Sequence, residues 1–284
     1  MKLDINLPEN FKLTSFLQDA RGESNLVYNC KGFIDTDEAE FYIKKRKKKK
    51  SLLSNEHEIL QKLKNYNIPV PKVLWYINNE LEEHLGLEKI TGIPLWEFID
   101  PRRKLYDQKK VTAYLTAYGE MLGKIHKIDL KHPLQRRIKL YSYDDLRVTD
   151  NIDLNRVIDW LDSNKPEHSE YVFTHSDFNL ANVLFSEDRI NGIIDWEWAG
   201  TGWKEYDLAW ILRERIAFTN TIQEREAILK GYCSSNDFNP KTLKWCEVLN
   251  YLHWIFWCKN STNSADNEYA GFAMNKISDL ISGN

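Results

Sequence analysis

Apolar positions in the first ninety residues come in short runs that are typical of strands. Residues 26–30 and 41–43 are runs of aliphatic and aromatic side chains, bounded by polar and turn-forming residues. Between 51 and 65 the apolar residues instead recur with a helical period. The pattern predicts a small sheet with one helix attached to it.

After residue 92 the pattern changes to that of long amphipathic helices. Between 107 and 127 apolar side chains return every three or four positions. A short region of strands and loops is predicted at 171–195, and helices resume after it. We therefore expect an α+β fold with two lobes, a small β-rich lobe at 1–90 and a larger helical lobe at 91–284.

Composition and charge exclude several classes of protein. Lys and Arg total 39 and Asp and Glu total 42, so the net charge is −3, whereas a dedicated nucleic-acid-binding protein is usually strongly basic. Basic charge is concentrated in one short segment, the run at 44–50. We interpret it as a solvated loop, and the alternative is a salt-sensitive contact with an acidic partner or a nucleic acid.

Cysteine spacing and hydropathy indicate a cytoplasmic protein. The four cysteines are too far apart for metal knuckles or redox pairs, which indicates free thiols in a reducing compartment. Acidic residues and a proline near the N-terminus argue against a secretion signal. No apolar run approaches the roughly 20 residues that span a bilayer, so we expect no membrane partner.

One segment has the residue types that phosphoryl transfer requires. The pattern His175-x-Asp177-x-x-x-x-Asn182 lies between two apolar runs, and Asp195 follows a third run. The reaction needs one carboxylate at the acceptor hydroxyl and oxygen ligands that hold Mg²⁺ on the phosphates. We assign Asp177 to the first role and Asn182 and Asp195 to the second, with His175 bracing the loop. The alternative is that Asp195 only caps a strand.

A lysine and a glutamate in the first lobe fit the same chemistry. Glu56 falls within the apolar stripe of the helix predicted at 51–65, whereas Glu58 points away from it. A carboxylate on a buried face is costly unless it is paired. Lys44, at the end of the strand around 41–43, supplies the cation, as in kinases whose strand lysine touches the α- and β-phosphates. The alternative is that Glu56 marks a partly exposed helix edge.

Together these motifs resemble the aminoglycoside phosphotransferase and choline kinase family, small-molecule kinases with a protein-kinase-like fold. The turn that contains Gly22, Ser24 and Asn25 is similar to the family's nucleotide loop, although a plain hairpin turn explains it equally well. The segment 87–92 resembles the hinge between the lobes. That likeness implies adenine bonds to the backbone of Glu88 and Ile90.

The chain departs from the family pattern in the catalytic loop. The family usually has Gly after the loop His and His-Pro-Gly before the Asn, whereas Ser176 and Asn-Leu-Ala at 179–181 stand here. Tyr-Asp-Leu-Ala at 206–209 matches a family motif in which Asp207 is structural. So few residues separate Asp195 from Asp207 that an activation loop, and with it a protein-kinase function, is not expected.

The resemblance implies a kinase that uses ATP, or GTP in its place, with Mg²⁺, in a cleft between the lobes. Its partners would be the nucleotide and a small acceptor with a hydroxyl group. A slight acidic excess in the second lobe favours an aminoglycoside-type antibiotic. The alternatives are a metabolite such as an amino alcohol, sugar or vitamin, and a nucleotide-binding pseudokinase. The apolar helix at 243–259 and the tryptophans at 196–203 are candidates for the acceptor wall or for the core.

Overall fold

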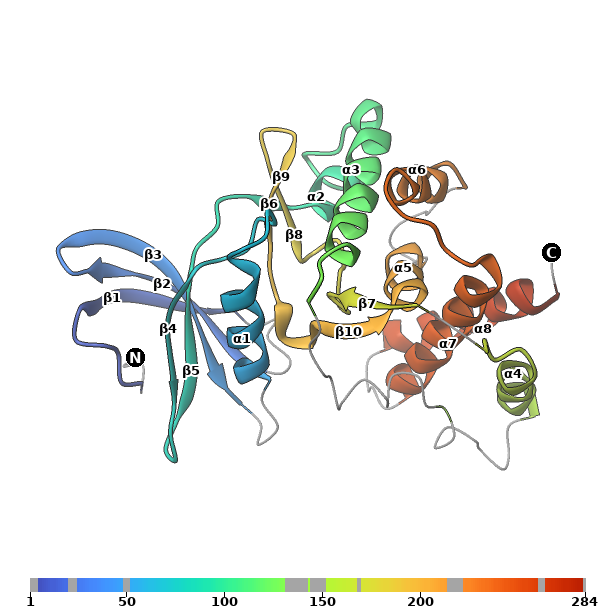
Figure 1. Ribbon diagram of the computed structural model, residues 1–284, viewed down its shortest axis with the longest axis horizontal. Coiled ribbons are helices and arrows are strands. Elements are labelled where there is room, and N and C mark those ends of the chain that lie inside the picture. Colours follow the sequence, from blue (N-terminus) through green and yellow to red (C-terminus); the bar gives the residue numbers. More distant parts are fainter. Residues whose placement is uncertain are drawn as a thin grey trace. The chain divides into compact units, whose positions relative to one another are not determined.

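The computed structural model places two compact units along the chain (Figure 1). It describes residues 5–19, 25–47, 52–130, 143, 152–167, 170–213, 222–259 and 264–282. The first unit comprises Met1–Ile93 and Val183–Ala199, and the second comprises Pro94–Asn182 and Gly200–Asn284. The first unit therefore takes in residues 183–199 in addition to the 1–90 lobe expected from the sequence.

A five-stranded antiparallel sheet in the order β1-β2-β3-β5-β4 forms most of the first unit. Its strands are β1 (Phe11–Asp19), β2 (Asn25–Ile34), β3 (Asp37–Arg46), β4 (Val73–Asn78) and β5 (Glu83–Glu88). Lys44 lies on the central strand β3, paired with Val27 of β2 on one side and with Leu85 of β5 on the other. Hydrogen bonding on both sides fixes the backbone of Lys44.

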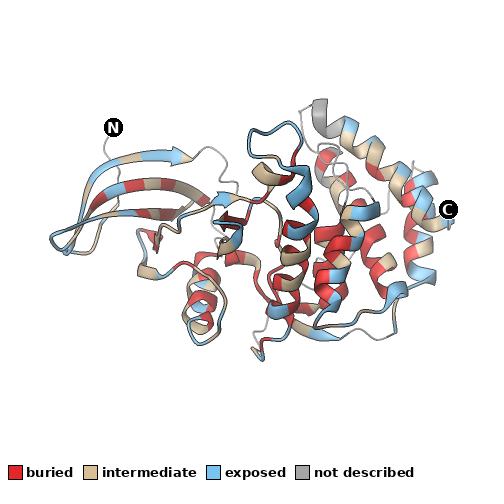
Figure 2. Cartoon of the chain, turned by 90° about the horizontal axis from the view of Figure 1, so that it is seen from above, coloured by how far each residue is buried: buried red, intermediate tan, exposed pale blue. Residues whose placement is uncertain are grey.

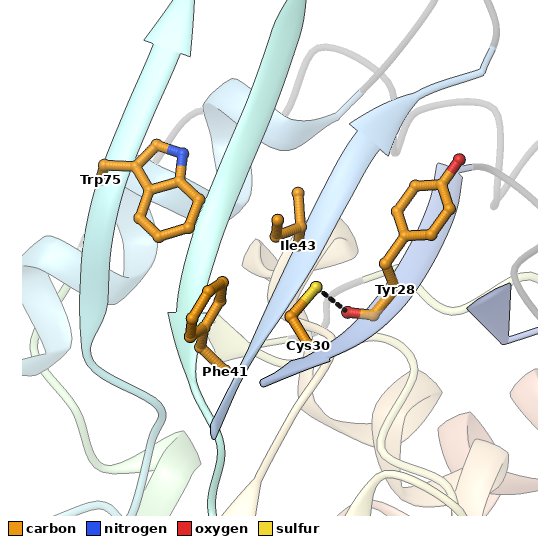
Figure 3. Packing of buried hydrophobic residues seen from close by; sticks show 5 residues of the cluster. All are labelled: Tyr28, Cys30, Phe41, Ile43 and Trp75. Atoms are coloured by element: carbon orange, nitrogen blue, oxygen red, sulfur yellow. Dashed lines mark hydrogen bonds between the residues drawn. The ribbon is translucent and has the colours of Figure 1, made fainter. Parts of the chain in front are cut away.

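The buried face of this sheet carries its own apolar core (Figure 3). The core comprises Tyr28, Cys30, Phe41, Ile43 and Trp75, and in Figure 2 the buried positions form bands along the strands. Residues two apart on one strand share a face, which explains the pairs 28/30 and 41/43. Burial raises the pKa of the Cys30 thiol to about 12, so this thiol stays protonated and unreactive. All four cysteines are free, as predicted.

The remaining elements of the first unit are a helix, a hairpin and one 3₁₀ turn. They are α1 (Leu53–Leu63), β8 (Val183–Ser186), β9 (Arg189–Ile193) and η3 (Trp196–Trp198). Ile193 N–H donates to the Pro69 carbonyl at 2.7 Å, and the Asn191 amide donates to the Thr91 carbonyl at 2.6 Å. These bonds attach the β8–β9 hairpin to the first unit despite its distance along the sequence.

The second unit is mainly helical, as the apolar periodicity predicted. Its helices are α2 (Trp96–Ile99), α3 (Gln108–His126), α4 (Ile152–Ser163), α5 (Lys204–Leu212), α6 (Ile222–Cys233), α7 (Pro240–Lys259) and α8 (Ser264–Ser282). β7 (Tyr171–Thr174) pairs with β10 (Gly200–Trp203), and the two-residue strand β6 (Ile93–Pro94) leads into this unit. No helix that the structure describes has the length and hydropathy of a membrane span.

Helices α3 and α6 approach so closely that only glycine fits at their contact. A Cβ atom on Gly119 would lie 2.0 Å from the Ile228 carbonyl oxygen. One on Gly231 would lie 2.0 Å from the Thr116 carbonyl oxygen.

The order of these elements confirms the α+β class and the helices predicted at 51–65, 107–127 and 243–259, within a few residues at each end.

Candidate active site

The Lys44 ammonium lies between two carboxylates of the first unit. Its Nζ is 2.8 Å from both carboxylate oxygens of Glu56 and 2.7 Å from Oδ1 of Asp195. Glu56 is fully buried in the apolar face of α1, whereas the Asp195 side chain is 36% exposed. The structure therefore brings these three predicted residues together, with Asp195 the member open to solvent.

Burial and charge act in opposite directions on this group. Burial alone would lower the pKa of Lys44, but the carboxylates of Asp195, Glu56 and Glu197 raise it above its ordinary value. Burial raises the pKa of the Glu56 carboxyl, and the Lys44 ammonium offsets part of that rise. Lys44 therefore remains a cation throughout the neutral range, as a phosphate contact requires.

Asp195 has an unusual backbone conformation at the end of the hairpin. Its φ of 68° lies in the left-handed region, which is uncommon for residues other than glycine. The next residue, Trp196, is fully buried and donates its backbone N–H to Glu56 at 3.3 Å and its indole N–H to the Ile193 carbonyl at 2.9 Å. Trp196 therefore belongs to the core, one of the two alternatives for this tryptophan.

Asn25 and Glu197 form a buried hydrogen bond that sequence analysis did not predict. The Asn25 amide donates to Glu197 Oε2 at 2.8 Å, and the two residues are 4% and 5% exposed. The Asn55 amide of α1 donates to the backbone carbonyls of Glu197 and Ala199. The chain just after Asp195 is thus fastened to both β2 and α1.

In the second unit, two asparagine amides orient the Asp177 carboxylate. The Asn179 Nδ2 donates to Oδ1 at 2.9 Å, and the Asn182 Nδ2 donates to Oδ2 at 3.1 Å. The Asp177 backbone N–H donates to His175 Nδ1 at 3.3 Å, which agrees with the bracing role expected for His175. The two bonds fix the orientation of this half-buried carboxylate.

Asp207 of α5 holds the backbone that leads to Asp177. Its carboxylate accepts the N–H of His175 at 2.9 Å and the N–H of Ser176 at 2.8 Å, and His126 Nε2 lies 3.3 Å from it. Ser176 has a φ of 72°, and its hydroxyl lies 3.0 Å from that of Thr174. The loop therefore keeps the left-handed turn in which glycine is favoured, with a serine that has local hydrogen bonds instead.

The predicted metal ligands suit Mg²⁺ by their chemistry. Asn182 turns its amide nitrogen toward Asp177, which leaves its oxygen directed elsewhere, and the Asp195 side chain is partly exposed. Among the described residues no three Asp, Glu, His or Cys side chains cluster as a metal site. Mg²⁺ typically takes only one or two protein carboxylates and completes its shell with phosphates and water.

The other predicted nucleotide contacts are only partly described. Gly22 and Ser24, like the basic residues 48–50, lie outside the described residues. The Glu88 backbone N–H donates to the Lys72 carbonyl at 2.9 Å. Ile90 packs over β9, where a Cβ atom on Gly192 would lie 2.6 Å from the isoleucine side chain.

The sequence of the chain matches a known protein family. The family model APH, the phosphotransferase enzyme family, matches residues 15–246. The chain belongs to this family. The aminoglycoside phosphotransferase resemblance of the motifs and the protein-kinase-like fold are thereby confirmed.

The curated relatives that match the chain are distant and carry different names. The chain is 24% identical to the probable acyl-CoA dehydrogenase IBR3 of Arabidopsis thaliana over 79% of its own length and 30% of that protein. It is 27% identical to the homoserine kinase of Zymomonas mobilis over 60% of its own length and 56% of that protein. The chain thus spans less than two thirds of the length of these relatives.

Solved structures show the same fold at low identity. Choline kinase LicA from Streptococcus pneumoniae superposes with a TM-score of 0.67 and 17% identity, covering 96% of this chain and 95% of that chain. The ADP-bound aminoglycoside phosphotransferase APH(2'')-Ib gives a TM-score of 0.60 and 14% identity, covering 95% of each chain.

Proposed function

We propose that this phosphotransferase transfers the γ-phosphoryl group of ATP, or of GTP, to a hydroxyl group of a small molecule. The observation that carries the proposal is the Lys44 ammonium held at 2.7–2.8 Å by Glu56 and Asp195. A fixed cation beside an accessible carboxylate is the arrangement that binds a nucleotide triphosphate with its metal ion. Membership of the family and an ADP-bound structural neighbour support it.

Each of the proposed site residues has a separate role in the reaction. Lys44 neutralises the α- and β-phosphates, and Asn182 and Asp195 are the proposed ligands of Mg²⁺, which supplies further charge neutralisation when bound. Asp177 orients the acceptor hydroxyl and finally takes its proton. An oxygen–phosphorus bond forms to the acceptor as the bond to the β-phosphate breaks, and ADP leaves. Such catalysis is mostly positioning and electrostatic stabilisation.

The acceptor is not fixed by the family. The similar proteins carry the names of kinases for homoserine and choline and of aminoglycoside phosphotransferases. The aminoglycoside expectation, which rested on a slight acidic excess, stays a prediction beside these others. ATP as donor and the free thiols fit the cytoplasmic location that we propose.

The test is ADP release with Mg²⁺ across a panel of hydroxylated acceptors, with products identified by the mass of one added phosphate. Asp177→Ala should lower kcat by about 10²–10⁴-fold and leave nucleotide binding nearly intact, because it removes only the proton acceptor. Asp153→Asn, at an exposed aspartate on α4, is the control. Nucleotide binding without turnover on every acceptor would favour a pseudokinase, and no nucleotide binding would refute the proposal.

A further inference from the structure

A tyrosine of α6 is connected to Asp207 through a histidine of α3. The Tyr232 hydroxyl lies 2.9 Å from Nδ1 of His126, and Nε2 of the same ring lies 3.3 Å from Oδ2 of Asp207. All three residues are buried: Tyr232 is 0%, His126 5% and Asp207 0% exposed. We call these residues the Tyr232–His126–Asp207 network.

The donors and acceptors of this network follow from its chemistry. Asp207 accepts the backbone N–H groups of His175 and Ser176, and these bonds favour its ionised form, which can only accept. Nε2 of His126 must therefore carry the proton that points to Asp207. A neutral imidazole then has an acceptor at Nδ1, and the Tyr232 O–H donates to it. Burial raises the pKa of Tyr232, so its hydroxyl keeps that proton.

Close packing of α6 against α3 fixes the tyrosine beside the histidine. The two helices lie side by side (Figure 1), and their backbones approach most closely at Gly231, the residue before Tyr232. The Asn236 amide donates to the Gly123 carbonyl at 2.9 Å, about one turn before His126. The Tyr232 hydroxyl therefore has little freedom to move away from the His126 ring.

The network ends at the backbone that carries Asp177. Ser176 has a φ of 72°, a conformation that residues other than glycine keep only where their surroundings hold them. The bonds from Asp207 to the loop supply that hold. Without the Tyr232 hydroxyl the His126 ring can turn, its bond to Asp207 weakens, and the loop that positions Asp177 is held less firmly.

We propose that Tyr232 is a positioning residue for phosphoryl transfer, acting through His126 and Asp207 on the backbone of the catalytic loop. The proposal rests on the proposed function, since the loop carries the aspartate that takes the acceptor's proton. A displacement of about 1 Å in a catalytic group can lower a rate about 10²-fold, so a residue without substrate contact can control kcat.

Removal of the hydroxyl alone tests this role. Tyr232→Phe should lower kcat about 5–10-fold, the usual effect of one hydrogen bond, and leave the KM for ATP unchanged. Tyr143→Phe is the matched control, because it also removes a buried hydroxyl that donates to an aspartate, Asp162, at 2.9 Å. The control should alter stability but not kcat. The proposal is wrong if neither variant lowers kcat, or if both lower it equally.

Substitutions of the histidine separate hydrogen bonding from packing. His126→Leu removes the donor to Asp207 and should lower kcat about 10-fold or more, whereas His126→Gln retains a donor nitrogen and should restore most of the loss. In the His126→Gln background, Tyr232→Phe should change kcat by less than about 2-fold, because an amide nitrogen is a donor whatever its neighbour does. An equal loss in both backgrounds would show that Tyr232 acts through packing, and would overturn the proposal.

Hydrogen exchange separates this proposal from the proposed function, because it requires no reaction. The backbone amides of His175 and Ser176 should exchange about 5–10-fold faster in Tyr232→Phe than in the unaltered protein, and at the unaltered rate in Tyr143→Phe. Faster exchange in a protein that phosphorylates no acceptor would refute the kinase and support the role of Tyr232 in holding the loop. Unchanged exchange would overturn that role, whether or not the protein is active.

Discussion

At the scale of single residues, the Lys44–Glu56 pair links stability to activity. The pair lies in the apolar face of α1, where a lone carboxylate would be uncompensated. Because the carboxylates around it raise the pKa of Lys44, the pair persists as pH rises past neutrality and weakens only when the pH passes that raised pKa. Stability and phosphate binding therefore depend on the same ammonium group.

Lys44→Met should lower the free energy of unfolding by about 3–5 kcal/mol, because it leaves Glu56 buried without a cation. The double variant Lys44→Met/Glu56→Leu should recover most of this loss and remain inactive. Denaturant unfolding and ADP release measure the two effects. Lys47→Met, at an exposed lysine, is the control. Full stability in the single variant would contradict the account of the ion pair.

The Asn25–Glu197 bond permits a second prediction at this scale. Asn25 is a described residue of the turn predicted as the nucleotide loop, and its amide is bonded to the segment that carries Asp195. Asn25→Ala should raise the KM for ATP about 5–10-fold and leave the acceptor KM unchanged, since one hydrogen bond is lost. Asn29→Ala, at a half-buried position of the same strand, should alter neither constant. An effect on kcat alone would argue against a positioning role.

At the scale of elements, the short helix α2 is stabilised by local contacts of charged side chains as much as by packing. The helix α2 is followed by its capping residue Asp100, which is 1% exposed and accepts two side-chain hydrogen bonds from Arg102 at 2.8 Å. Arg103 lies over the Trp96 ring of the same helix at 3.9 Å. A helix of one turn is unstable alone, so these contacts define where it ends.

Acid should weaken this local structure in a predictable range. The Arg102 side chain lowers the pKa of Asp100 to about 2, against an ordinary value of 3.8. A lowered pKa contributes stability above the unfolded value and loses it as the pH falls from about 4 to 2. Asp100→Asn should therefore cost about 1 kcal/mol at pH 7, because the exposed Arg102 is screened by solvent.

Denaturant unfolding of Asp100→Asn and the unaltered protein from pH 7 to pH 2 measures the effect. The difference between the two should shrink below pH 4 and vanish near pH 2. Asp279→Asn, at an exposed position of α8, is the control and should show no such trend. A difference that stays constant with pH would show that Asp100 acts through packing instead of charge.

At the scale of the whole molecule, metal binding and folding should be separable. The described residues contain no cluster of three or more acidic, His or Cys side chains that would hold a structural metal. Because the proposed Mg²⁺ acts only in phosphoryl transfer, chelation with EDTA should abolish ADP release and leave the Tm unchanged, and excess Mg²⁺ should restore turnover. Mg²⁺ with ATP should raise the Tm, because a ligand that binds only the folded state stabilises it. A fall in Tm with EDTA alone would contradict this separation.

The sequence predicts those features of the structure that local residue patterns determine. The period of apolar residues is enough for α1 and α3, and the need to pair a buried carboxylate is enough for Lys44 and Glu56. The Asn25–Glu197 bond joins residues 172 positions apart, and neither side chain has a local signal that names its partner. The attachment of residues 183–199 to the first unit depends on bonds to Pro69 and Thr91, which no periodicity reveals.

The division of the chain also has a consequence for its synthesis. Residues 94–182 are made after most of the first unit and before its last segment, Val183–Ala199. At about 5–20 residues per second, a ribosome needs on the order of 5–20 s to bridge that interval. During this time the nascent sheet can form the Lys44–Glu56 pair but lacks Asp195. The first unit therefore completes its folding late. The rate of translation across residues 94–182 sets the length of that delay.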